Sequence, residues 1–158
     1  MEIFSSCNAS GGGVSFKILE AVNASNYTSN SILNSNAVKT TPVVLVGSAV
    51  WLNVPLNRNT ISSAETPLDS SGSAYQVNFS LFVTGNEVEN INAFEQLQGK
   101  RFLIDFTDNN DNRRLFGFSD EALKLSISFN VPEVVTGISG HALTFSGMVS
   151  KRAPKYDF

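Results

Sequence analysis

The sequence predicts a mainly β protein, an antiparallel β-sandwich or barrel with one short helix. From residue 42 onward, apolar side chains recur at every second position in several segments, which is typical of strands with one buried face. A three-residue spacing of apolar side chains occurs once, between residues 88 and 98, which indicates a helix. Because polar turns and not helices join the strand segments, antiparallel pairing is favoured over a parallel α/β sheet.

The 158 residues fit a single domain, and their composition changes along the chain. Residues 1–40 are rich in Ser, Asn, Gly and Thr, so we expect an N-terminal arm there. Apolar residues such as Phe16 and Ile18 can anchor this arm, either to its own domain or to a neighbouring subunit. Residues 41–158 are expected to form the sandwich or barrel, with the helix near 88–98.

The strand segments follow one another along the second part of the chain. They are Val44 with Val46; Val50, Leu52, Val54 and Leu56; Tyr75, Val77, Phe79, Leu81 and Val83; Phe102, Ile104 and Phe106; Arg113 to Phe118; Leu123 to Val131; and Leu143, Phe145 and Val149. Gly47 and Ser48 separate the first two rows, and a leading glycine suits a type II′ turn, which predicts a hairpin. A second hairpin is predicted around the polar segment 108–112.

Two further segments complete the expected fold. The helix is predicted to end at Gly99, a residue suited to the left-handed conformation that caps helices. Residues 57–73 are expected to form a long polar loop. Compact domains keep such loops chiefly where they bind a ligand or contact a partner.

Composition argues against several classes of function. The formal net charge is −3 and the pI is about 5.1, which disfavours a non-specific nucleic-acid binder. The single cysteine, Cys7, and the single histidine, His141, exclude an intrachain disulfide, a Cys/His zinc site and most histidine-centred catalysis. His141 is expected at a turn or on the surface. We therefore expect a protein that is not an enzyme and uses no cofactor.

One short motif suggests a metal. Asp108, Asn110 and Asn112 match the opening of a calcium-binding loop, in which oxygen ligands fall on alternate residues. Arg113 stands where such a loop needs glycine, and Ser119 where it needs a bidentate glutamate. A hairpin turn stabilised by Asn and Asp side chains is therefore favoured over a calcium site.

Basic residues and one tryptophan are the candidate interface residues. Lys100, Arg101, Arg113 and Arg114 are expected to cluster at one end of the predicted hairpin, and a second group contains Lys151, Arg152 and Lys155. Nearby acidic residues favour an inter-subunit salt-bridge patch at least as much as a phosphate site. Trp51 alternates out of its apolar row, so it is either an interface anchor on the outer face or a residue buried between two sheets.

The C-terminal half carries a pattern of short motifs. They are Asn92–Phe102, Asp105–Asn110, Leu115–Gly117, Leu143–Gly147 and Arg152–Pro154. In order, they give a short helix, a Gly-basic-aromatic strand start, an Asp-Asn hairpin, a Leu-rich strand, and Thr-Phe-Ser-Gly before a basic, Pro-containing tail. This pattern resembles small structural tail proteins of tailed phages and prophages of Bacteroidetes-type bacteria.

The resemblance implies a non-enzymatic virion protein of the tail, made in the host cytoplasm. Tail-tube subunits are β-sandwiches or barrels with a flanking helix, and they join sheets across subunits into a ring whose lumen passes DNA. The resemblance therefore implies a homo-oligomeric ring or stacked rings, with other tail proteins as partners, no specific DNA binding and no membrane. A tail terminator or completion protein and a head–tail connector are alternatives within this class.

A different class of function is also compatible with the sequence. Trp51 and the polar loop at 57–73 can together form the site of a carbohydrate- or ligand-binding β-sandwich.

Overall fold

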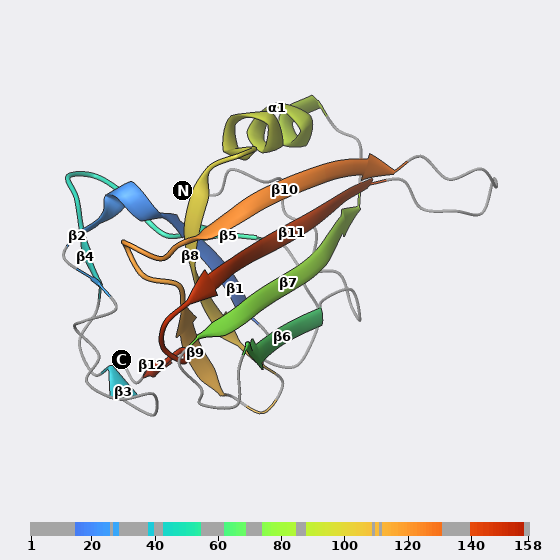
Figure 1. Ribbon diagram of the computed structural model, residues 1–158. Coiled ribbons are helices and arrows are strands. Elements are labelled where there is room, and N and C mark those ends of the chain that lie inside the picture. The colour runs from blue at the N-terminus through green and yellow to red at the C-terminus, as the bar shows by residue number, and fades with distance from the viewer. Residues whose placement is uncertain are drawn as a thin grey trace.

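The computed structural model describes residues 15–25, 27–28, 38–39, 43–54, 62–68, 74–84, 88–108, 110, 112–130 and 140–156. Within these residues the chain forms twelve strands, a single turn of 3₁₀ helix and one α-helix (Figure 1). Ten strands belong to one large sheet and two to a small one. The predicted fold class is confirmed as sandwich-like and mainly antiparallel with one short helix, and the sheet is not a closed barrel.

The elements have the following bounds. The large sheet contains β1 (Ser15–Glu20), β3 (Val38–Lys39), β5 (Leu52–Asn53), β6 (Ser62–Pro67), β7 (Tyr75–Thr84), β8 (Arg101–Thr107), β9 (Arg113–Phe116), β10 (Leu123–Asn130), β11 (Gly140–Val149) and β12 (Lys155–Tyr156). The small sheet pairs β2 (Ala24–Ser25) with β4 (Val44–Leu45) and follows the 3₁₀ helix η1 (Ala21–Asn23). The α-helix α1 spans Val88–Leu97. No helix in the described part of the chain is long and apolar enough to cross a membrane.

The large sheet folds into two layers that share strand β8 (Figure 1). Arg101 and Phe102, at the start of β8, pair with β10, whereas the later residues of β8 pair with β9 on the same side. Strand β1 pairs along the other side of β8. One layer therefore contains β10, β11, β7 and β6, and the other contains β5, β1, β8, β9, β12 and β3.

Phenylalanine rings fill the space between the two layers. Phe16 of β1 packs on Phe79 of β7 and on Phe145 of β11, with ring centroids 5.6 Å apart in both pairs. Phe79 also meets Phe116 of β9 edge to face at 4.7 Å, and Phe102 meets Phe145 at 6.0 Å. All five rings are buried. Because each ring buries a large apolar area, this contact between layers explains the high phenylalanine content.

The clearest alternating rows form the predicted strands. Every second residue of β7 from Tyr75 to Val83 is buried, as the alternation predicts. The hairpin of β8 and β9 and the strand β10 are confirmed. The predicted helix is confirmed as α1, and Gly99 has the left-handed φ of +78° that was expected after its end.

The hairpin predicted around Gly47 is wrong. A turn forms there, with Gly47 at a φ of +59° and a hydrogen bond of 3.2 Å from the Ala49 nitrogen to the Val46 oxygen. However, β4 pairs with β2, and β5 pairs with β1. Val44 and Val46 are exposed, whereas Leu45 between them packs against the core, so this row of valines faces away from it.

Two boundaries expected from composition also change. Strand β1 lies inside the segment 1–40 that was expected to be an arm, yet it pairs with β8 over six residues and buries Phe16, Ile18 and Leu19. A core strand therefore begins at Ser15, inside the segment that is rich in Ser, Asn, Gly and Thr. Within the expected loop 57–73, residues 62–67 form β6, which pairs with β7. Cys7 lies outside the described residues.

Candidate functional site

The register of β8 and β9 separates the first group of basic residues. Arg113 and Arg114 lie opposite the last two residues of β8, whereas Lys100 and Arg101 lie at or just before its start. The predicted cluster of these four residues is therefore wrong. Lys100 instead forms an ion pair with Glu20, with 3.5 Å between Nζ and Oε2.

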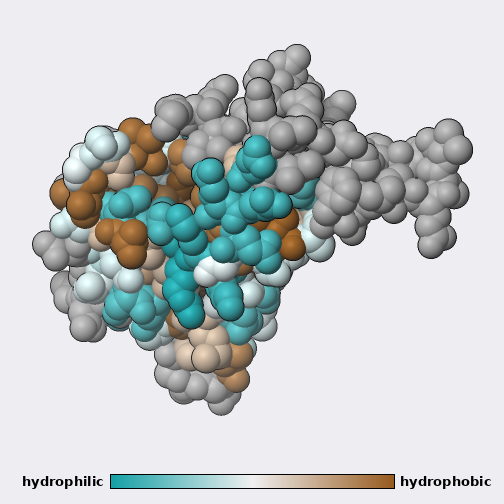
Figure 2. Space-filling model, turned by 90° about the horizontal axis from the view of Figure 1, so that it is seen from above, coloured by the Kyte–Doolittle hydropathy of each residue, from teal (hydrophilic) through white to brown (hydrophobic). Residues whose placement is uncertain are grey.

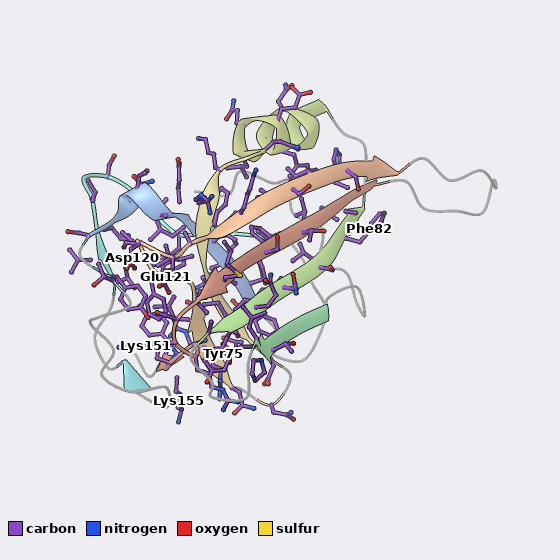
Figure 3. All side chains as sticks on the ribbon, in the orientation of Figure 1. Tyr75, Phe82, Asp120, Glu121, Lys151 and Lys155 are labelled. Atoms are coloured by element: carbon purple, nitrogen blue, oxygen red, sulfur yellow. The ribbon has the colours of Figure 1, made fainter. Side chains whose placement is uncertain are left out.

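Arg113 and Arg114 join the second basic group at the opposite end of β8. Lys155 of β12 pairs with Arg114 of β9 in the sheet. Glu65 of β6 bridges two members, because its Oε1 lies 3.7 Å from Arg152 Nε and 4.0 Å from Arg114 Nη1. We call Arg113, Arg114, Arg152 and Lys155 the basic end. Figure 3 shows Lys151 and Lys155 with Tyr75 at this lower end of the molecule.

Strand alternation sorts the basic end onto two faces of its layer. Arg114 lies opposite Phe106 on one side and opposite Lys155 on the other. Residues directly opposite each other in a sheet share a face, so these three side chains lie on the same face. Arg113, one residue earlier, lies on the other face together with Asp105.

Asp105 and Arg113 form a part-buried ion pair. Arg113 Nε donates to Asp105 Oδ1 at 3.0 Å, and Nη2 donates to Oδ2 at 2.7 Å. The guanidinium carbon lies 4.4 Å from the centre of the Tyr156 ring. The hydrogen bond to Asp105 raises the pKa of Arg113, so the guanidinium stays charged. Because it is bidentate and stacked, this arginine has a fixed position.

A pocket lies on the face of Arg114 and Lys155. It has a volume of about 420 Å³ and is open to solvent on one side. Its lining residues are Phe106, Asp108, Asn112, Arg113, Arg114, Phe116 and Lys155. They come from three neighbouring strands and the turn between β8 and β9, and together they combine aromatic rings with cations.

The turn after β8 is held by the Asp108 side chain, as the favoured interpretation of the Asp108, Asn110 and Asn112 motif predicts. Asp108 Oδ1 accepts hydrogen bonds from the backbone nitrogens of Asn110 at 2.8 Å and Asn112 at 3.0 Å, and Oδ2 accepts one from Asn112 Nδ2 at 3.2 Å. The backbone hydrogen bond from Asn112 makes the largest contribution to lowering the pKa of Asp108. Among the described residues no group of three or more His, Cys, Asp or Glu could hold a metal ion.

His141 is buried, so the expectation of a turn or surface position is wrong. It is the second residue of β11 and is 4% exposed. Its ring centroid lies 4.5 Å from that of Phe94 of α1, which covers this part of the strand. Burial lowers the pKa of His141, so the ring is neutral in the folded protein at pH 7.

Trp51 is half-buried and packs against the hydrophobic core beside β5. Its exposure lies between those of the two expected alternatives, an outer-face anchor and a residue buried between two sheets. Strand β6, which makes up most of the described part of the segment 57–73, belongs to the other layer of the sandwich. The described residues thus assign Trp51 and this segment to different layers, and they define no shared ligand site.

A surface patch that the sequence did not reveal lies on η1 and on the segment from β4 toward β5. Val22, Val44, Val46 and Val50 are 74%, 64%, 50% and 46% exposed. The two segments adjoin, because the Val46 nitrogen donates to the Asn23 oxygen at 2.9 Å and Ser25 pairs with Val44. Figure 2 shows apolar atoms gathered at this end of the molecule. We call these four residues the valine patch.

The fold and its surfaces define a class of protein, a sandwich-like antiparallel β protein with an apolar patch on two surface segments and a basic end at β8, β9 and β12. Comparison of the chain with family models, with curated proteins and with solved structures found no match. The function is therefore inferred from these surfaces and from the sequence pattern of the C-terminal half.

Proposed function

We propose that this chain is a non-enzymatic structural protein that self-assembles into a ring or tube of a phage tail. The observation that carries the proposal is the valine patch, in which four large apolar side chains are exposed on adjoining segments. Contiguous apolar surface of this kind marks contact with another macromolecule. The resemblance of the C-terminal half to phage tail proteins supports a tail-tube-like subunit, with a terminator, completion or connector protein as the alternative.

The open sheet supports assembly through strand edges. Strand β6 is the last strand of one layer, and within the described residues it pairs with β7 alone. Its other edge therefore presents backbone donors and acceptors that a strand from a neighbouring copy can pair with. This pairing would supply hydrogen-bond partners to backbone groups that, at an unpaired strand edge, can template aggregation.

The free energy of association requires both the valine patch and the strand edge. Burying four half-exposed valines contributes on the order of 4 kcal/mol, at about 1 kcal/mol for each side chain. Association costs roughly 4–15 kcal/mol in lost translational and rotational freedom. The valine patch alone therefore does not hold two copies together, and strand pairing must supply the rest.

The first test is native mass spectrometry of the purified chain, followed by negative-stain imaging of the same sample. We expect rings or tubes of defined stoichiometry. Val44→Glu should weaken assembly at least tenfold, because it places a charge inside the apolar contact. Met148→Glu is the matched control, since Met148 on β11 is equally exposed, at 64%, and lies outside the patch. A monomer at every concentration, or equal effects of the two variants, would contradict the proposal.

The assignment to a tail is tested separately. Phage particles purified from the bacterium that encodes the chain should contain it in many copies, as measured by quantitative mass spectrometry, and antibodies should label the tail. Absence of the chain from purified particles would reject this part of the proposal, even if the protein forms rings by itself.

A further inference from the structure

The pocket at the basic end combines an aromatic floor with three cationic lining residues, of which Arg113 is already paired with Asp105, and the assembly proposal makes no use of it. We infer that this pocket binds a carboxylate carried on an aromatic or apolar body. Its volume of about 420 Å³ leaves room for one such group. The inference depends neither on the valine patch nor on strand pairing.

The floor of the pocket is rigid and apolar. Phe106 and Phe116 line it, and both rings pack edge to face on Phe79 of the opposite layer, with centroids 5.6 Å and 4.7 Å apart. Phe106 is only partly buried and lines the pocket. An aromatic body can therefore pack on these rings without displacing the core.

The rim carries two cations in register. Arg114 and Lys155 lie opposite each other on β9 and β12, so their side chains leave the sheet side by side. The Arg114 side chain is 47% exposed, and the carboxylate of its ion-pair partner Glu65 is 4.0 Å away. Within the described residues Lys155 forms no ion pair. Both cations can therefore turn toward a carboxylate that enters the pocket.

The neighbouring acids are already occupied. Glu65 is shared with Arg152, and its Oε2 also accepts a hydrogen bond from the Ala153 nitrogen at 2.9 Å. Asp105 is held by Arg113 on the other face of the layer. Asp108 lines the pocket and accepts three hydrogen bonds from its own turn. Its charge repels a second strong negative charge, which favours a singly charged carboxylate over a phosphate.

Two sources can supply this chemistry. One is a free aromatic acid, and the other is a pair of acidic and aromatic side chains on a neighbouring copy of the chain. Both place a carboxylate between Arg114 and Lys155 and a ring on Phe106 and Phe116. The experiment therefore tests the shared chemistry first and then distinguishes the sources.

Ligand-observed saturation-transfer NMR with phenylacetate as the probe tests the site, because it works for monomers and for large assemblies. We expect saturable binding of phenylacetate and at least tenfold weaker binding of the neutral phenylacetamide. Arg114→Gln and Lys155→Gln should each weaken phenylacetate about tenfold, the loss typical of one charged hydrogen bond. Lys124→Gln, at an exposed lysine of β10, is the matched control and should change nothing.

Three results would contradict the inference, and a further measurement distinguishes the two sources. If phenylacetate shows no saturable binding to dilute protein, if the amide binds equally well, or if both pocket variants bind like the parent, the inference is wrong. Where binding is found, native mass spectrometry with excess phenylacetate distinguishes the sources. A loss of oligomer means that a neighbouring copy normally supplies the carboxylate, and an unchanged oligomer means that the pocket takes a free acid.

Discussion

Asp105 shows how a single side chain can fix the position of two strands. Asp105 is 3% exposed, and its carboxylate pairs with Arg113, which lies two residues from the direct cross-strand partner of Asp105, Leu115. The ion pair thus connects β8 and β9 diagonally, in addition to their backbone hydrogen bonds. Tyr156 of β12 lies against the same guanidinium, so the three strands meet at one charge.

Asp105→Asn should lower the free energy of unfolding by about 2 kcal/mol. The substitution keeps the shape of the side chain but leaves the Arg113 charge without its partner, and partial exposure of Arg113 moderates the loss. Urea denaturation measures the effect. Glu95→Gln, at an exposed position of α1, should stay within about 0.5 kcal/mol of the parent. A similarly small loss for Asp105→Asn would mean that the stacking of Arg113 on Tyr156 suffices.

His141 should make stability depend on pH. Burial lowers its pKa in the folded protein below the ordinary value of 6.5, so the unfolded chain binds the proton more readily. The contribution of neutral His141 is complete above about pH 6.5 and is lost as the pH falls below that value.

Unfolding free energies at about pH 7.5 and 5.5 should therefore differ, with the lower value at the lower pH. His141→Gln removes the titrating group and should flatten this difference, since the chain has a single histidine. An equal slope in the variant would assign the pH dependence to other groups.

At the scale of elements, the end of α1 depends on one backbone conformation. Gly99 has a φ of +78°, and a Cβ built there would meet nothing within 4 Å. The cost of replacing it is therefore backbone strain and not crowding.

Gly99→Ala should lower the free energy of unfolding by about 1 kcal/mol, the typical cost of an L-residue in the left-handed region. Gly99→Asn should cost less than half as much, because asparagine tolerates this region better. Thermal or urea unfolding of the two variants measures both losses in the free energy of unfolding. Equal losses would show that the side chain, and not the backbone angle, is responsible.

Elements with one buried face could be predicted from the sequence. The alternation from Tyr75 to Val83 reports burial because β7 lies in the middle of its layer with one face on the core. The same alternation at Val44 and Val46 was misleading, since valine spacing does not say whether a second sheet covers the strand. Burial of His141 could not be predicted either, because it depends on where α1 packs.

The candidate sites depend on which strands pair and in which register, and this could not be predicted from the sequence. Lys155 and Arg114 are far apart along the chain, and only the pairing of β12 with β9 places them side by side. The sequence offered the basic residues as candidates, but Lys100 and Arg101 lie at the opposite end of β8 from Arg113 and Arg114. The valine patch was missed because three of its members, Val44, Val46 and Val50, were expected in a buried hairpin.

At the scale of the whole molecule, both layers depend on one strand. Strand β8 pairs with β1, β9 and β10, and four of its seven residues are buried. Backbone pairing connects the two layers through β8, because β10 pairs with its first two residues while β1 and β9 pair with its later residues. The protein should therefore unfold in one cooperative transition, and amide hydrogen exchange should be slowest in β8, with a free energy of opening equal to that of global unfolding.

Sharing one strand also has a consequence for synthesis and for mechanical load. Strand β8 follows β7 in the chain but precedes β10 and β11, so during translation neither layer is complete until the last long strand has emerged. The nascent chain must keep its phenylalanine-rich surfaces from aggregating during this interval. Once folded, a force applied to one layer is transmitted through β8 to the other, and the two layers resist it as one body.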